Sequence, residues 1–118
     1  MKGEQGVPVT STAREANKVR ERLARIPDDL HRVRATERVL AEQVEYLEEL
    51  ANDAETRKLV AQTPLADREW RDARTDLDRH SALLEEARQE VRELLAEQDR
   101  LLDRLFELEA GKRRRDDE

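Results

Sequence analysis

The feature that most constrains this 118-residue chain is a pair of heptad stripes that mirror each other about Thr63 and Pro64. Residues in each stripe recur in alternating steps of three and four, the spacing of the a and d positions of a coiled coil. The first stripe consists of Val19, Leu23, Ile26, Leu30, Val33, Glu37, Leu40, Val44, Leu47, Ala51, Ala54, Lys58 and Ala61. The second consists of Ala66, Trp70, Ala73, Leu77, His80, Leu84, Ala87, Val91, Leu94, Gln98, Leu101, Leu105 and Leu108. Paired from the turn outward, the two residue numbers of each pair add up to 127 or 128, as a chain that folds back at residue 63 requires.

The pattern predicts an all-α fold, a long antiparallel two-helix coiled-coil hairpin, with dimerisation of two hairpins into a four-helix bundle as a further option. A composition of 44% charged and 3% aromatic residues suits a thin seam between helices better than a rounded core. An alternative is one continuous helix, kinked at Pro64, that pairs antiparallel with a second chain. Charge of this density is also typical of disorder, but the sustained heptads argue against a disordered chain.

Local signals divide the chain into three parts. Residues 1–11 read as a disordered N-terminal tail, and Thr12 with Glu15 fits a capping box that starts a helix. The hairpin is expected over residues 12–110, with arms 12–62 and 64–110, a turn at 62–65, and a kink or short break near Pro27. Gly111 is expected to end the second helix, which leaves residues 111–118 as a charged C-terminal tail.

Charges support the fold-back. Residues 14–38 contain eight basic and five acidic side chains, whereas the opposing residues 90–110 contain three basic and seven acidic ones. The register predicts two attractive pairs near the turn and two repulsive pairs along the arms: Arg57 with Glu69 and Glu55 with Arg74, then Asp29 with Glu97 and Arg22 with Arg104. Exposed pairs contribute on the order of 0.2–1 kcal/mol each, so the apolar seam is expected to set the register.

Two apolar sets lie beside the seam. Val39, Tyr46, Leu50 and Val60 lie on the flank of the first arm, and Leu95, Leu102 and Phe106 on that of the second. Because a two-helix hairpin buries little of either flank, these seven residues are predicted to form a partner or oligomer interface. The predicted function is a non-enzymatic protein–protein interaction module, namely an adaptor, scaffold or assembly subunit. Its expected partners are another protein or a second copy, with a homodimer favoured.

The hairpin tip is the basis of an alternative function. Thr63 can cap the second helix, Pro64 suits its first position, and Asp67, Arg68 and Trp70 follow. Lys58, opposite Trp70, is expected to make a cation–π contact. A tip of this kind could insert into a larger machine such as a polymerase. Similar long hairpins occur in transcript-cleavage factors of the Gre type, whose tip loop carries an acidic pair, but this loop has one acid and no family is assigned.

The middle of the first arm is acidic. Glu42, Glu45, Glu48, Glu49, Asp53 and Glu55 lie in a stretch, residues 39–56, that has no basic residue. This run either receives a basic surface or is a solvated face. The net charge of −6 disfavours nucleic acid and anionic membranes as partners, although Lys112 to Arg115 form a short basic run. His80, at a seam position, is either a pH-sensitive notch or a half-buried histidine.

Little in the sequence suggests chemistry at a site. There is no Gly-rich phosphate loop, nucleophile elbow or catalytic triad, so no enzymatic activity and no small-molecule ligand is expected. The chain has no cysteine, and neither of its two histidines, His31 and His80, has a second ligand at metal-binding spacing, so no metal or cofactor is expected. No secretory signal or membrane-spanning run is present, and a cytoplasmic location is expected.

Overall fold

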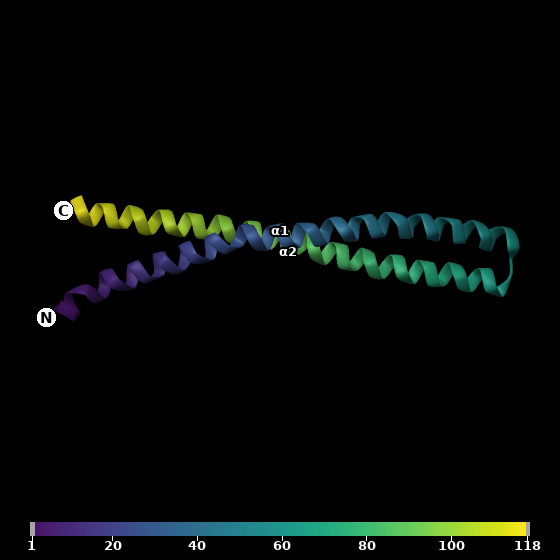
Figure 1. Cartoon of the computed structure of the whole chain (residues 1–118), viewed down its shortest axis with the longest axis horizontal. Coiled ribbons are helices and arrows are strands. Elements are labelled where there is room, and N and C mark those ends of the chain that lie inside the picture. Colours follow the sequence, from purple (N-terminus) through teal and green to yellow (C-terminus); the bar gives the residue numbers. More distant parts are fainter. Residues whose placement is uncertain (1, 118) are drawn as a thin grey trace. The chain divides into compact units, whose positions relative to one another are not determined.

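Two long helices make up the fold (Figure 1). The computed structural model describes the backbone of residues 2–117 and the side chains of residues 11–116. Helix α1 spans Lys2–Ala61 and helix α2 spans Pro64–Asp117, so only Gln62 and Thr63 separate them. The two helices pack antiparallel, which confirms the predicted all-α hairpin. A single helix that continues through Pro64 and pairs only with another chain is therefore wrong.

The chain divides into two compact units. The terminal unit consists of Met1–His31 and Arg92–Glu118, and the turn unit is Arg32–Val91. In each unit, a segment of α1 lies beside an antiparallel segment of α2 (Figure 1). Each unit is therefore a two-helix layer whose only interior is the seam between the helices.

The turn is fixed by two residues with distinct roles. Gln62 adopts a left-handed conformation, with φ of 52°, and its N–H donates to the Lys58 carbonyl at 3.0 Å. Thr63 forms the cap expected from the sequence, because its Oγ1 accepts the Ala66 N–H at 3.1 Å and its carbonyl accepts the Asp67 N–H at 3.1 Å. Pro64 lies at the first helical position, where its missing N–H costs nothing.

Both helices are longer and less interrupted than the sequence suggests. The backbone of α1 is helical from Lys2, whereas the sequence predicts a tail over residues 1–11; the side chains of residues 1–10 lie outside the described ones. Of the kink or short break expected near Pro27, the break is absent, because α1 continues through the proline. Ile26 is completely buried and Leu30 is 7% exposed, so the seam holds the helix on both sides of the proline. Helix α2 passes Gly111 without the positive φ of a helix-ending glycine.

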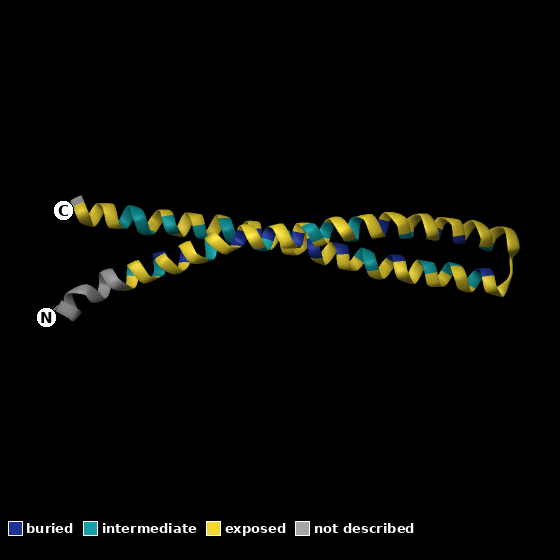
Figure 2. Cartoon of the chain, viewed as in Figure 1, coloured by how far each residue is buried: buried dark blue, intermediate teal, exposed yellow. Residues whose placement is uncertain are grey.

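The predicted seam is the core. Figure 2 shows buried residues that recur along both helices and are separated by exposed ones. Among the described residues, every buried side chain is apolar and, except for Ala16, belongs to the predicted stripes. In the terminal unit these are Ala16, Val19, Ile26, Leu30 and Leu94; in the turn unit they are Val33, Val44, Ala51, Ala54, Ala66, Leu77, Leu84 and Ala87. Ala16 extends the first stripe by one more step of three.

Candidate protein-binding surfaces

The first candidate surface is the turn-unit stripe, which we define as Val39, Tyr46 and Leu50 of α1. Their spacing of seven and four residues places all three side chains on one face of the helix. They are 54%, 60% and 39% exposed, respectively, so the seam does not use them. Val60, predicted with them, is 80% exposed near the turn. The predicted exposure is confirmed, and the binding role stays a prediction.

Leu83 was not among the predicted surface residues, yet it adds to this face. It is 42% exposed and directly precedes a buried seam residue of α2, Leu84. Leu50 stands in the same relation to Ala51 on α1. Arg57 and Glu69 also directly precede seam residues, and they pair across the two helices with an N···O distance of 3.8 Å. Leu50 and Leu83 therefore lie on this same side of the turn unit.

Unpaired acidic groups lie beside the turn-unit stripe. Glu42, Glu45, Glu49 and Asp53 are exposed, and none of them forms an ion pair with any other described residue. No basic residue lies within residues 39–56 of α1. This part of α1 therefore offers negative charge that the chain itself leaves uncompensated.

The second candidate surface is the terminal-unit stripe, which we define as Leu95, Leu102 and Phe106 of α2. These side chains are 36%, 50% and 68% exposed. Their spacing of seven and four repeats that of the turn-unit stripe, so they too share one helix face. As predicted from the sequence, they lie beside the seam rather than in it.

Ion pairs clasp the two helices of the terminal unit. Arg22 donates two hydrogen bonds to Glu97, from Nε at 2.9 Å and from Nη2 at 2.7 Å, and a third from Nη1 to Asp29 at 2.9 Å. The sequence register had paired Asp29 with Glu97 and Arg22 with Arg104 as repulsive contacts. Asp29 does lie near Glu97 and acts to raise its pKa, but Arg22 binds both carboxylates, and Arg104 binds Glu15 and Glu107. Arg22 lies between the two carboxylates instead. Its hydrogen bonds lower the pKa of Glu97, and the two carboxylates raise the pKa of Arg22.

A second group of ion pairs between the two helices lies farther along the terminal unit. Arg104 donates to both carboxylate oxygens of Glu15, at 2.6 and 3.0 Å, and also to Glu107 at 3.2 Å. The hydrogen bond from Arg104 lowers the pKa of Glu15. Arg20 pairs with Glu109 at 3.1 Å. The bidentate contacts of Arg22 and Arg104 match opposite charges across the two helices of the terminal unit, in the register set by the seam.

At the tip, Lys58 of α1 contacts two side chains of α2. The Lys58 ammonium lies 3.8 Å from the centroid of the Trp70 ring, which confirms the predicted cation–π contact, and it pairs with Asp67 at 3.5 Å. Asp67 also pairs with Arg71 at 3.2 Å. Arg74, predicted to pair with Glu55, pairs instead with Asp78 on its own helix at 3.7 Å. Trp70 is thus held within the tip, and Arg68 is exposed.

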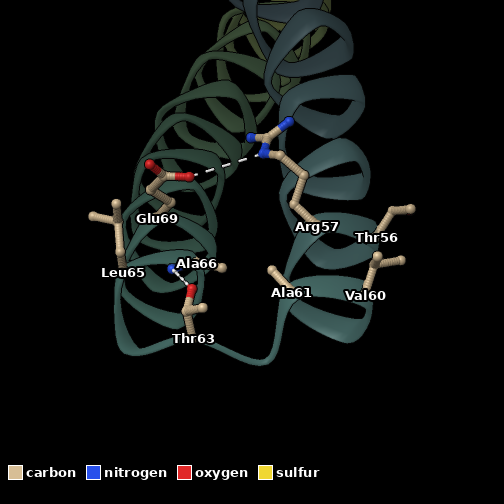
Figure 3. Close-up of a pocket in the computed structure, with 8 residues that line it drawn as sticks. All are labelled: Thr56, Arg57, Val60, Ala61, Thr63, Leu65, Ala66 and Glu69. Atoms are coloured by element: carbon tan, nitrogen blue, oxygen red, sulfur yellow. Dashed lines mark hydrogen bonds and ion pairs between the residues drawn. The ribbon is translucent and has the colours of Figure 1, made fainter.

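An open apolar hollow lies beside the turn (Figure 3). It is lined by Thr56, Arg57, Val60, Ala61, Thr63, Leu65, Ala66 and Glu69. In Figure 3 the side chains of Thr56 and Val60 point away from α2, whereas Arg57 reaches toward Glu69. Leu65 is 63% exposed and Leu59 is 66% exposed. The hollow does not enclose a ligand, but it adds exposed apolar groups around Thr63 and Pro64.

His80 makes only a local contact. Its ring is half-buried at the seam, and Nδ1 lies 2.9 Å from the Asp76 carbonyl one turn earlier, a hydrogen bond in the tautomer that carries the Nδ1 proton. Within the described residues, no three metal-ligating side chains gather at one point. Neither helix contains, in its described part, an apolar stretch that could cross a membrane.

No family model matches the chain, and neither a curated protein nor a solved structure is similar to it.

Proposed function

We propose that this protein is a non-enzymatic interaction module that binds protein surfaces through helix packing and acts as an adaptor, scaffold or assembly subunit. The observation that carries the proposal is the pair of exposed apolar stripes, in which Tyr46 and Phe106 are 60% and 68% exposed. An exposed apolar stripe on a helix is a common site for a second helix to dock.

The energetics of the hairpin favour a binding role for the stripes. Burial of apolar surface stabilises a complex by roughly 25 cal/mol per Å². In each unit, the two helices already bury their apolar seam residues against each other, and no described stripe residue is buried there. The stripes therefore contribute little to folding, and their free energy of burial is available to association.

The test combines Tyr46→Glu with Phe106→Glu. We expect the double variant to lose self-association or partner capture, measured by light scattering over a concentration series, while circular dichroism shows unchanged helicity. The matched control, Asn52→Glu with Ala82→Glu, adds the same charge at exposed positions away from the stripes. Unaltered mass and capture in the stripe variant would refute the proposal.

A second candidate function is insertion of the tip into a larger assembly such as a polymerase. It is favoured by Leu59, Val60 and Leu65, which are 66%, 80% and 63% exposed around the turn. A photo-crosslinking residue at position 65 should then capture a partner in the host cell, and one at position 46 should not. Substitution of Asp67, Arg68 or Trp70 would impair a tip inserter, whereas stripe substitutions would impair an assembly module.

A further inference from the structure

The turn-unit stripe is bordered by charges of opposite sign at its two ends. Arg32 lies on the N-terminal side of the stripe, seven residues before Val39, and Asp53 lies on the C-terminal side, seven residues after Tyr46, so both share the helix face of the stripe. Read in reverse, the order basic, apolar, acidic becomes acidic, apolar, basic. The face is therefore complementary to an antiparallel copy of itself.

We propose that the occupant of the turn-unit stripe is the same stripe of a second copy, packed antiparallel about a two-fold axis beside Gln43. This inference rests on the proposed function and names its partner. Symmetry of this kind is isologous and closes after two chains, the commonest arrangement of soluble homo-oligomers.

One register satisfies both the apolar and the charged groups. Residue 43 lies close to the midpoint between Val39 and Tyr46, so Val39 of one copy meets Tyr46 of the other, twice per dimer. The same midpoint places Leu50 opposite Thr36 of the second copy, whose hydroxyl donates to the Arg32 carbonyl of its own helix at 3.3 Å. The centre of the contact is thus apolar, and a threonine meets Leu50 at each end.

The charges agree with this register. Arg32 lies opposite Asp53 of the second copy, because this pair shares both the helix face and the midpoint of Val39 and Tyr46. Among the described residues, Asp53 forms no ion pair within the chain. The contact that opposes association is between the two copies of Glu42, on the solvent-exposed rim at the axis, where water and salt screen it.

A parallel arrangement is excluded by the same charges. In register, it places Arg32 against Arg32 and Asp53 against Asp53 of the second copy. Like charges face each other at both ends of the stripe. Charge pattern alone therefore selects the antiparallel orientation.

Leu83 supplies independent support. Leu83 lies on the same side of the turn unit as Leu50. Its neighbour Leu84 pairs with Val44 across the seam, so Leu83 lies level with Val44 along the helix axis. The proposed two-fold axis, beside Gln43, lies at the same level. Two copies of Leu83 therefore come to the same side of the dimer near its two-fold axis, which accounts for a leucine that is 42% exposed in the single chain.

The orientation is tested by two charge reversals that are studied separately and together. Arg32→Glu puts two acids against each other at both symmetric contacts, and Asp53→Arg puts two bases there. We expect each variant alone to dimerise roughly tenfold more weakly than the 13.8 kDa wild-type chain, measured by sedimentation. An equimolar mixture of the two variants restores opposite charges and should associate as tightly as wild type.

Crosslinking tests the axis itself. Because the chain has no cysteine, Gln43→Cys introduces a single thiol beside the axis, and a short bismaleimide should join two copies of the full-length protein. The control Asn52→Cys, on the opposite face of α1, should not crosslink. A wild-type chain that stays monomeric, a mixture no tighter than either variant, or crosslinking at position 52 alone would overturn the inference. The proposed function would fail separately, if Tyr46→Glu with Phe106→Glu changed neither mass nor capture.

Discussion

The terminal unit and the turn unit share one heptad seam but differ in what lies beside it. In the terminal unit, Arg22 and Arg104 each hold at least one carboxylate of the other helix in a bidentate contact. In the turn unit, six exposed acids of α1 have no ion-pair partner among the described residues, and an apolar stripe lies on the same stretch of helix. The charges of the terminal unit are thus used between its own helices, whereas those of the turn unit are left open to the partner that we propose.

The seams differ as well. Half of the buried seam residues of the turn unit are alanines, namely Ala51, Ala54, Ala66 and Ala87, whereas large aliphatic residues dominate that of the terminal unit. Small side chains let two helices approach closely but bury little area. The turn unit therefore gains less from its own seam, and the proposed association through its exposed stripe would offset this deficit.

The largest effect is expected from truncation of Ile26, the completely buried large side chain of the terminal unit. Ile26→Ala should lower the free energy of unfolding by about 3 kcal/mol, because it removes buried methyl groups and leaves a cavity. Ile26→Val should cost about 1 kcal/mol. Urea denaturation measures both; equal effects of the two variants would contradict tight packing around Pro27.

The alanine-rich seam of the turn unit should be destabilised by a larger side chain, whereas the terminal unit is destabilised by a smaller one. Ala54 is 1% exposed, so Ala54→Leu should overpack the contact and cost about 1–3 kcal/mol in the urea experiment. Ala61→Leu, at an exposed seam position beside the turn, is the matched control and should be nearly neutral. If Ala54→Leu were as stable as wild type, the close approach of the helices would be wrong.

A smaller loss of stability is expected at acidic pH, through the ion pairs between the two helices of the terminal unit. The pKa values of Glu15 and Glu97 lie below the ordinary value of 4.5 because arginine hydrogen bonds favour the charged carboxylate. Their contribution to stability is therefore complete above pH 4.5 and is lost as the pH falls through the folded-state pKa values. Carboxyl NMR titration should show both shifts.

Arg22→Met sharpens this experiment. It retains most of the aliphatic stem but removes the guanidinium, so the pKa of Glu97 should rise toward its ordinary value while that of Glu15 stays low. Arg74→Met, which removes an exposed pair on a single helix, should leave both titrations unchanged. A low pKa for Glu97 in Arg22→Met would show that another group holds the charge.

The sequence predicted the seam well and its surroundings less well. Steps of three and four put the seam on one face of each helix, so the mirrored stripes predicted the seam and favoured the fold-back. The same stripes also fitted one continuous helix paired with a second chain, and the turn at Gln62 and Thr63 decides between the two. Ion-pair partners were harder, because an arginine side chain spans a helical turn. Arg22 reaches both Asp29 and Glu97, whereas straight register pairs it with Arg104. Continuation through Pro27 was missed because tertiary packing outweighs a local helix breaker.

The candidate surfaces were only partly predictable for a related reason. Exposure of Tyr46 and Phe106 follows from their distance from the seam. Leu83 was missed because it directly precedes a buried leucine, and neighbours in sequence point to different faces. Its position, one residue before a seam residue, was the available signal. The identity of a partner depends on a second surface, which the spacing of one chain does not contain.

The smallest predicted effect concerns the turn that joins the two helices of the turn unit. Gln62 has a φ of 52°, a region in which a side chain clashes with the backbone and glycine does not. Gln62→Gly should therefore raise the free energy of unfolding by roughly 0.5–1 kcal/mol, after the greater flexibility of glycine in the unfolded chain is counted. Gln62→Ala keeps a Cβ and should give no gain. Because Thr63 caps α2 whatever stands at position 62, Thr63→Ala should cost about 1 kcal/mol in either background, and additive effects in urea denaturation would show that the two turn residues act independently.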